Sequence, residues 1–194
     1  MQNLNKIICG VDEVGRGSLA GPVVAAAVIL PNKHYIVGLN DSKKLSAKER
    51  IKLSIKIKRI AISIGIGSVE ASIIDSVNIR NATIQAMEDA IKNLKKRPDL
   101  VLVDGLDKLE INLPTKNIIR GDSSEECIMA ASIYAKVNRD KLMENYALQY
   151  PNFGFENNKG YGTKFHLNAL KNHNPSPLHR LSFKPMKNKK SRIL

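Results

Sequence analysis

The chain of 194 residues has little cysteine and no long apolar run. With two cysteines only, Cys9 and Cys127, it has neither a framework of several disulfides nor the cysteine spacing of a zinc site. The longest apolar run, residues 23–30, is too short to cross a bilayer. Residues 1–6 lack the charged and then apolar pattern of a signal peptide. We therefore expect a cytoplasmic protein with reduced thiols.

Acidic residues are also scarce. The sequence has 18 of them against 31 lysines and arginines, which gives a formal net charge of +13. A surface with this balance attracts polyanions, and nucleic acid is the first candidate. Many proteins are this basic without catalysing a reaction, so the charge predicts a class of partner and no more. The Gly-x-x-x-x-Gly-Lys-Ser/Thr sequence is absent, which argues against a P-loop NTPase. Nothing in the sequence demands more than a monomer.

The pattern of apolar residues predicts an α/β protein with a mixed sheet. Strands are expected at residues 7–11, 23–30, 60–66, 100–103 and 117–119. Helices are expected at residues 46–59, 79–95, 123–150 and 164–171, with a short helical turn at residues 72–75. The first two strands are expected to form a hairpin around the glycine-rich residues 15–21.

Two local patterns refine this prediction. Residues 46–49 and 123–126 both have the spacing of a capping box, in which a serine and a later glutamate close the first turn of a helix. From Ile60 to Ile66, isoleucines alternate with small residues, which predicts a strand with one buried face.

The end of the chain is basic. From residue 157 onward, nine lysines and arginines occur without an acid. We expect one domain over residues 1–183, with a C-terminal helical part from about residue 151. We expect residues 184–194 to form a mobile basic tail.

Acidic side chains stand at the ends of three predicted strands. Asp12 and Glu13 follow the first strand, Asp104 ends the fourth, and Asp122 follows the fifth, just before a helix. Each alone could be a solvated acid or a helix cap, but ligands bind at such strand ends in open α/β sheets. Two carboxylates about 4 Å apart repel by about 4 kcal/mol at an effective dielectric of 20, so a converging group needs protons or cations.

Oxygen donors without histidine or cysteine favour a hard ion, Mg²⁺ or Mn²⁺. Because neighbouring residues on a regular strand point to opposite faces, Asp12 and Glu13 are expected to share one site only if the strand ends there. Two such ions about 3.5–4 Å apart can activate a water and hold the leaving oxygen in phosphodiester cleavage.

Basic and glycine residues flank these acids. Lys43 and Lys44 stand in a loop before a helix start, a suitable place to meet phosphate. Gly15, Arg16 and Gly17 allow a backbone to approach a sugar–phosphate chain closely. Two hypotheses remain at this point: a metal-dependent nuclease, and a basic nucleic-acid-binding protein whose acids only cap elements. The wide separation of the acids in sequence, each at a strand end, favours the nuclease.

Six motifs, in order along residues 7–185, resemble those of the type 2 ribonuclease H family in its bacterial ribonuclease HII branch. They are residues 10–17 (GVDEVGRG), 41–45 (DSKKL), 103–105 (VDG), 121–122 with 131–137 (GD and ASIYAKV), 160–163 (GYGT) and 175–183 (PSPLHRLSF). Another ribonuclease H-like nuclease, such as a junction resolvase, is the alternative, and residues 15–17 together with Tyr161 argue against it.

The resemblance implies a ribonuclease H-like fold, a five-stranded mixed sheet flanked by helices with a C-terminal helical extension. It implies an endonuclease, a phosphodiester hydrolase that cuts the RNA strand of RNA–DNA hybrids and cuts duplex DNA 5′ to an embedded ribonucleotide, leaving 3′-hydroxyl and 5′-phosphate ends. Such an activity belongs to ribonucleotide excision repair.

The resemblance also implies roles for individual residues. It makes Asp12, Glu13, Asp104 and Asp122 the catalytic ligands of Mn²⁺ or Mg²⁺. It makes Gly15, Arg16 and Gly17 the readers of the ribose 2′-hydroxyl, the group that distinguishes RNA from DNA. Tyr161 would stack on the adjoining deoxyribose, and Lys43 would bind substrate. We expect Ser132 to be a helix-packing residue, and His166, His173 and His179 to be packing or phosphate-side residues.

Overall fold

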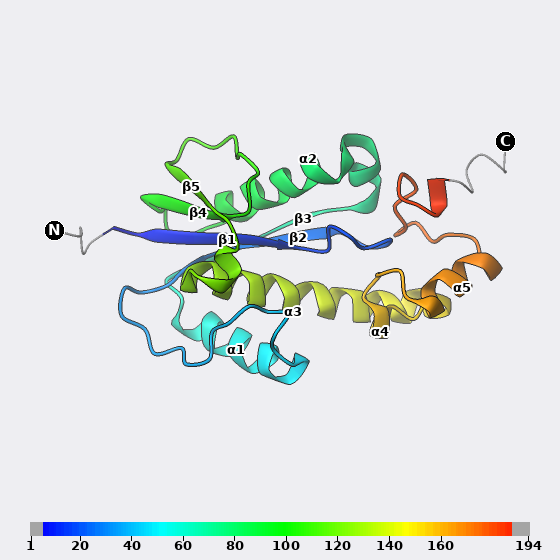
Figure 1. The fold of residues 1–194 in the computed structure, drawn as a ribbon, viewed down its shortest axis with the longest axis horizontal. Coiled ribbons are helices and arrows are strands. Elements are labelled where there is room, and N and C mark those ends of the chain that lie inside the picture. Colours follow the sequence, from blue (N-terminus) through cyan, green and yellow to red (C-terminus); the bar gives the residue numbers. More distant parts are fainter. Residues whose placement is uncertain (1–5, 188–194) are drawn as a thin grey trace.

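A computed structural model describes residues 6–187, which form a single sheet with helices on both faces (Figure 1). The strands are β1 (Ile8–Val14), β2 (Val23–Ile29), β3 (Ser63–Val69), β4 (Leu100–Asp104) and β5 (Thr115–Ile118), in the order β3-β2-β1-β4-β5. β1 and β2 form the predicted antiparallel hairpin, and β3 pairs antiparallel with β2. β4 runs parallel to β1, and β5 runs parallel to β4. The prediction of a five-stranded mixed sheet is therefore confirmed.

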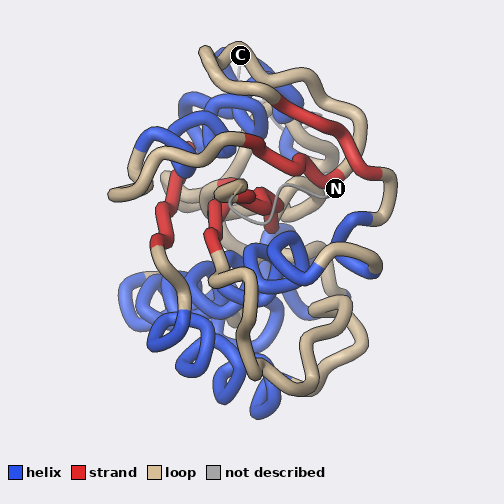
Figure 2. Tube along the Cα trace, turned by 90° about the vertical axis from the view of Figure 1, so that its left-hand side faces the viewer, coloured by secondary structure: helices blue, strands red, loops and turns tan. Residues whose placement is uncertain are grey.

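The helices are α1 (Ala47–Ile60), α2 (Ala71–Lys92), α3 (Glu126–Gln149), α4 (Phe155–Asn158) and α5 (Lys164–Asn172), with short 3₁₀ turns η1 (Gly121–Ser123) and η2 (Pro151–Phe153). α2 covers one face of the sheet, while α3 and α1 lie on the other (Figures 1 and 2). α5 lies beyond the end of the β1–β2 hairpin, and α4 packs against α3 near that end (Figure 1). No helix within residues 6–187 is long and apolar enough to span a membrane.

Three groups of buried side chains hold this arrangement together. One lies between the sheet and α2 and includes Val11, Ala25 and Met87. A second joins the sheet to α1 and α3. The third, which we call the terminal core, consists of Leu19, Ala20, Met143, Ala147, Phe153, Phe155, Ala169, Leu170 and Met186. The terminal core joins the loop after β1 to the C-terminal helices, so it determines where that loop lies.

The prediction from the alternating isoleucines is wrong about which face of β3 is more deeply buried. Ile60 is the last residue of α1 and Ile62 is exposed, so the strand begins only at Ser63. Its more deeply buried face carries Gly65 and Gly67 instead of the isoleucines. A Cβ at either glycine would lie 2.0 Å from a carbonyl oxygen of α2. Glycine is required there because α2 packs directly against the strand backbone.

The predicted turn at residues 72–75 and helix at residues 79–95 are joined in α2. The backbone breaks at Asn78, where φ is 69°. The Asn78 side-chain oxygen accepts hydrogen bonds from the backbone N–H groups of Arg80 and Asn81. Asn78 therefore ends one helical segment and caps the next, which is why the sequence pattern separated them.

One of the two predicted capping boxes is present. Ser46 and Glu49 form theirs at the start of α1. The box predicted at residues 123–126 is wrong, because α3 begins at Glu126 without a side-chain cap. Residues 121–123 form η1 instead, and the Ser123 hydroxyl donates to Asp122.

The predicted basic tail begins inside packed structure. Met186 is buried in the terminal core, because its side chain fills space beside α5. Packed chain therefore continues past the boundary expected at residue 184. Residues 188–194, the rest of that expected tail, lie outside the described residues.

Candidate active site

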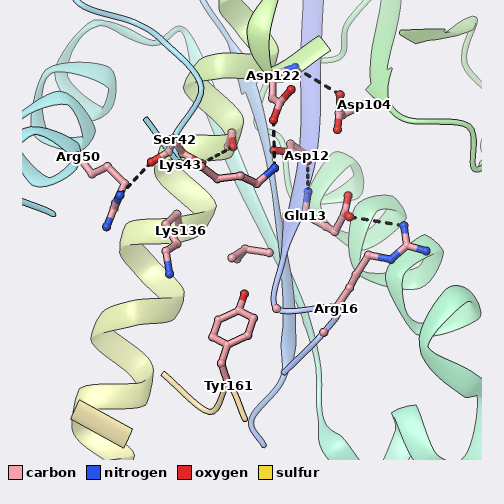
Figure 3. A pocket seen from close by; sticks show the side chains of 14 residues that line it. Asp12, Glu13, Arg16, Ser42, Lys43, Arg50, Asp104, Asp122, Lys136 and Tyr161 are labelled. Atoms are coloured by element: carbon pink, nitrogen blue, oxygen red, sulfur yellow. Dashed lines mark hydrogen bonds and ion pairs between the residues drawn. The ribbon is translucent and has the colours of Figure 1, made fainter. Parts of the chain in front are cut away.

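Four carboxylates from three separate segments line one cavity of about 440 Å³ (Figure 3). Asp12 and Glu13 come from β1, Asp104 is the last residue of β4, and Asp122 lies in η1. Since β1 and β4 are parallel neighbours, their carboxyl ends meet at the same edge of the sheet. The fold thus brings together the acids that the sequence placed about ninety residues apart.

The expectation that β1 ends at the acids is wrong. β1 stays paired with β2 through Glu13 and Val14. On its other side, the pairing with β4 stops at Val11 and Val103. Beyond that point one edge of β1 is uncovered, so side chains from both faces border the same opening. Asp12 and Glu13 can therefore share one cavity although they lie on a regular strand.

Asp12 is the most enclosed of the acids, with 5% of its surface exposed. Burial raises its pKa well above the ordinary value, and repulsion by Glu13 and Asp104 raises it further. A hydrogen bond from Ser132 on α3 and one of 2.7 Å from the Glu13 amide oppose that shift. Ser132 was expected only to pack, yet it lines the cavity and orients Asp12. Ser132 stands four residues before Lys136, so the two side chains lie on the same helix face, and both line the cavity. That spacing was the available signal in the sequence.

Glu13 and Asp104 are also short of compensating positive charge. Burial raises the pKa of Glu13, and Arg16 only partly opposes this. Burial and then repulsion by Asp122 raise the pKa of Asp104. The Asp122 amide donates to Asp104 Oδ1 at 3.3 Å. Charge repulsion of this kind is what a bound cation would relieve.

Lys43 reaches the acids from the loop before α1. Its ammonium lies 3.4 Å from Asp122 Oδ2. Burial alone would lower the pKa of Lys43, but the nearby carboxylates, with Asp122 foremost, raise it. The loop is anchored beside the site, because Ser42 Oγ lies 2.9 Å from Ser132 Oγ and Arg50 donates to the Ser42 carbonyl.

The donors suit a hard divalent cation in kind, since all of them are carboxylate oxygens. Their placement is less complete. Within residues 6–187, no three His, Cys, Asp or Glu side chains are close enough together to hold a metal ion as they stand. Lys43 and backbone amides occupy the carboxylate oxygens instead.

Two buried arginines hold the glycine-rich loop that follows the acids. Arg180 donates to the carbonyl oxygens of Arg16 and Gly21, at 2.8 to 3.1 Å. Arg139 on α3 donates to the carbonyl oxygens of Ala20 and Pro22, and to that of Lys159. Both arginines are fully buried. Burial lowers the pKa of Arg180 to about 9.

The sequence reasoning did not single out either arginine. Arg180 lies inside the motif at residues 175–183, and Arg139 continues the row of small residues on α3. For Arg139, a basic residue on an otherwise small and apolar helix face was the available signal.

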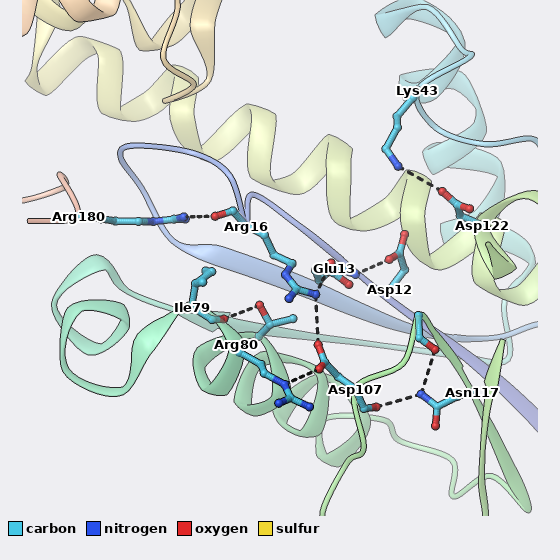
Figure 4. Close-up of polar contacts among 12 residues, drawn as sticks. Asp12, Glu13, Arg16, Lys43, Ile79, Arg80, Asp107, Asn117, Asp122 and Arg180 are labelled. Atoms are coloured by element: carbon cyan, nitrogen blue, oxygen red, sulfur yellow. Dashed lines mark hydrogen bonds and ion pairs between the residues drawn. The ribbon is translucent and has the colours of Figure 1, made fainter. Parts of the chain in front are cut away.

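The side chain of Arg16 points away from Arg180, toward Glu13 and Asp107 (Figure 4). It lies 3.5 Å from Glu13 and 3.2 Å from Asp107. Asp107 also pairs with Arg80 of α2 at 2.8 Å. Arg16 therefore links the acids to α2 through Asp107, a residue that the sequence analysis missed because it stands in an irregular loop after β4.

The structure requires a glycine at position 15 but leaves room for a side chain at position 17. Gly15 has a φ of +92°, and a Cβ there would overlap the Arg139 side chain at 2.2 Å. A Cβ on Gly17 would meet nothing within 4 Å. Gly15 is thus required by the packing of the loop, whereas the space at Gly17 stays open toward the cavity that it lines.

Tyr161 lines the same cavity from the loop before α5 (Figure 3). Two cations of α3 lie near its ring, with Lys136 Nζ 5.8 Å and Arg139 Cζ 5.6 Å from the ring centroid. Its backbone carbonyl lies 2.9 Å from Nδ1 of His166. His166 and His179 are buried in the surroundings of the terminal core, as expected of packing residues, and His173 is exposed.

The sequence was then compared with known proteins. The family model for ribonuclease HII matches residues 9–186. A ribonuclease HII of Leuconostoc mesenteroides is 53% identical over 93% of this chain and 71% of its own length. A ribonuclease HII of Syntrophus aciditrophicus is 52% identical over 92% of this chain and 84% of its own length.

Solved structures show the same fold. A ribonuclease H2 of Pyrococcus horikoshii aligns with a TM-score of 0.82 at 24% identity, over 95% of this chain and 97% of that one. The structure of a Bst ribonuclease HIII in complex with Mn²⁺ aligns with a TM-score of 0.72 at 16% identity, over 98% of this chain and 71% of that one.

Proposed function

The chain belongs to the ribonuclease HII family and is an endoribonuclease of ribonuclease H type, and on that premise we propose a metal-dependent cut at ribonucleotides. Its substrates would be the RNA strand of RNA–DNA hybrids and duplex DNA with an embedded ribonucleotide. The observation that carries the proposal is the convergence of four carboxylates on one cavity, which basic side chains and a glycine-rich loop flank.

Asp12, Glu13, Asp104 and Asp122 would hold Mn²⁺ or Mg²⁺. Bound there, the ions would activate a water for attack on the phosphodiester and stabilise the departing 3′ oxygen, leaving 3′-hydroxyl and 5′-phosphate ends. Ser132 and the Glu13 amide would orient the Asp12 carboxylate through the hydrogen bonds already described. Support for the metal comes from the lack of compensating positive charge around these acids, which hard cations would supply.

Basic side chains around the cavity would hold the phosphates. Lys43, Arg50 and Lys136 line one side and Arg16 the other (Figure 3). These side chains bind any sequence, because phosphate contacts position a nucleic acid without reading its bases. Binding should weaken with salt, by about 0.9 in the log–log slope for each phosphate contact on a duplex.

Recognition of the ribose would belong to the loop and to Tyr161. The open space at Gly17 allows the backbone of residues 15–17 to approach a 2′-hydroxyl closely. Tyr161 would stack on the neighbouring deoxyribose with its ring. We propose that the enzyme acts as a monomer in the cytoplasm, in ribonucleotide excision repair.

An incision assay tests this function. Purified protein is given three labelled duplexes, namely a DNA duplex with one ribonucleotide, an RNA–DNA hybrid and an all-DNA control, each with Mg²⁺, with Mn²⁺ or with a chelator. We expect cuts in the first two duplexes only, only with a metal ion, and 5′ to the single ribonucleotide. Equal cutting of the all-DNA control would remove the role proposed for residues 15–17, and undiminished cutting in chelator would remove the metal site.

A further inference from the structure

Two buried histidines connect the C-terminal segment to Tyr161. Nε2 of His166 lies 3.0 Å from Nε2 of His179. At the other ring nitrogens, His166 Nδ1 lies 2.9 Å from the Tyr161 carbonyl oxygen, and His179 Nδ1 lies 2.9 Å from the Ser176 backbone nitrogen. The contacts form a continuous chain from Ser176 to Tyr161, across residues of the loop before α5, α5 itself and the final segment.

The partners at the two ends determine where the ring protons are. A carbonyl oxygen can only accept, so His166 carries its proton on Nδ1 and its Nε2 is bare. His179 Nδ1 lies 2.9 Å from the Ser176 amide, which can only donate, and 3.3 Å from the Ser176 carbonyl oxygen, which can only accept. The shorter contact favours a bare Nδ1, with the proton of His179 on Nε2. His179 Nε2–H therefore donates to His166 Nε2. With this arrangement every ring nitrogen has a partner while both rings are neutral, and the Ser176 hydroxyl, 2.9 Å from His179 Nδ1, adds a second donor to that nitrogen.

The surroundings favour this neutral state. The rings of Phe153 and Phe155 lie against the pair, with centroids 4.6 to 6.2 Å from those of the histidines. Burial lowers the pKa of His166. Burial and then His166 lower the pKa of His179 to about 4.

The charged and titratable groups around the pair are already engaged or distant. Arg180, from the same segment as His179, donates to the carbonyls of Gly21 and Arg16. Arg139 of α3 donates to loop carbonyls, and Tyr146 of α3 and Tyr150, the residue after α3, pack at the border of the terminal core. His173, the residue after α5, lies against the ring of Phe153 in an edge-on arrangement. Within residues 6–187, no ion pair includes either ring of the histidine pair.

We propose that His166 and His179 are positioning residues for Tyr161, and that their neutral hydrogen-bonded chain holds the Tyr161 ring at the cavity for its substrate. The inference rests on the proposed function, because it assumes that Tyr161 contacts the nucleic acid. His166 acts through the Tyr161 backbone, which it anchors on one side while Lys136 and Arg139 border the ring on the other. Loss of the anchor would loosen substrate binding more than it would slow the chemical step.

The chain itself is tested in the wild-type protein by long-range ¹H–¹⁵N correlation spectra of the imidazole nitrogens. Single substitutions of the four histidines assign the signals. At pH 6.5 we expect two neutral rings, His166 with its proton on Nδ1 and His179 with its proton on Nε2. The opposite tautomer of either ring, or a charged ring at that pH, would overturn the chain whatever the enzyme cuts.

The consequence for substrate is tested by kinetics on the duplex with one ribonucleotide. His166→Leu removes the donor to Tyr161, whereas His166→Asn keeps an N–H near the place of Nδ1. We expect His166→Leu to raise KM about tenfold, the effect of one well-formed hydrogen bond, with kcat changed less than about threefold. His166→Asn should recover most of that loss. His173→Leu, on the exposed end of the same helix, is the matched control and should leave KM unchanged.

A double variant separates positioning from general loss of structure. If His166 acts through Tyr161, His166→Leu should add no further rise in KM in a Tyr161→Ala background. Independent, multiplying effects would overturn the inference, as would a fall in kcat at constant KM. Thermal melting of each variant identifies one that fails to fold, in which case the tautomer spectra of the wild-type protein decide. If wild-type protein cuts no ribonucleotide substrate, the proposed function fails, and those spectra still decide the chain.

Discussion

The cavity has two halves that are built by opposite means. In the carboxylate half, formed by Asp12, Glu13, Asp104 and Asp122, side chains face the opening and the backbone of the sheet holds them. In the loop half, residues 15–17 and Tyr161 line the cavity, and buried side chains hold the loop of residues 15–22 and the Tyr161 backbone from behind. The first half concentrates charge in the cavity, whereas the second directs buried donors at carbonyl oxygens.

The difference shows where each half is vulnerable. The carboxylate half is destabilised by its own charges, because burial and repulsion raise the pKa values of Asp12, Glu13 and Asp104. The loop half depends on donors that have no substitute, because Arg139 and Arg180 each satisfy several carbonyls at once. We expect changes in the first half to abolish chemistry and changes in the second to loosen recognition.

The largest expected effect is in the carboxylate half. Asp104→Asn should reduce cleavage of a hybrid by about 10³-fold or more, the scale of losing a group that stabilises the transition state, with hybrid binding largely kept. In the absence of metal ions at pH 7, the same variant should melt at a higher temperature than wild type, because burial and repulsion by Asp122 disfavour the ionised carboxylate, as its raised pKa reports, and an amide avoids that cost in stability.

The control for Asp104→Asn is Asp89→Asn, which changes an acid that pairs with Lys92 on α2, away from the cavity. It should change neither cleavage nor melting. Full activity of purified Asp104→Asn would remove the metal site from the proposed function.

The next largest effect is expected in the loop half. Arg180→Lys keeps a positive charge but cannot reach the carbonyls of both Arg16 and Gly21 with one forked group. A buried carbonyl left without a donor costs about 1–3 kcal/mol, so the melting temperature should fall. Discrimination between the duplex with one ribonucleotide and the all-DNA duplex should fall as well. A variant that melts early but discriminates as wild type does would show that Arg180 supports the fold alone.

The pH dependence of stability should report on the loop half through His179, whose ring pairs with that of His166 behind Tyr161. The folded pKa of His179, lowered to about 4, lies below the ordinary 6.5, so the unfolded chain binds the proton first as the pH falls. The contribution of His179 is thus complete above pH 6.5 and is lost progressively toward pH 4. Denaturant unfolding across that range measures it. His179→Phe should flatten this part of the profile, and His173→Asn should not.

The smallest expected effect concerns the link between the halves. Asp107→Asn weakens the partly exposed ion pairs with Arg16 and Arg80, each worth about 0.2–1 kcal/mol. We expect a rise in KM of about two- to threefold, stronger at low salt, with kcat nearly constant. A large fall in kcat would mean that Arg16 acts on the reacting phosphate, and the division between the halves would then be too sharp.

Much of the carboxylate half could be predicted from the sequence. Asp12 and Asp104 each follow a short apolar run, and such runs predict strands whose carboxyl ends meet in an α/β sheet. The place of Glu13 could not be predicted in the same way, because it depends on how far β4 covers the edge of β1. Ser132 was missed for a related reason, since its role exists only where α3 crosses above Asp12.

The loop half could be predicted only in part. Residues 15–17 and Tyr161 were indicated by motifs, but the side chains that hold them were not. A guanidinium or imidazole that binds a carbonyl leaves no complementary charge in the sequence, because every residue has a carbonyl. Arg180 meets Gly21 across 159 residues of chain, and Arg139 meets Pro22 across 117.

By itself the sequence determined the order of strands and helices, the family, the acids of the cavity and the basic character of the surface. Local periodicity, composition and motif spacing are properties of neighbouring residues, so they can be read directly along the chain. The tertiary structure alone decided which face of β3 is buried, how Asp12 and Glu13 share one cavity, and which buried donors hold the glycine-rich loop and Tyr161. Those features depend on contacts between distant segments, and packing selects among partners that the sequence leaves equivalent.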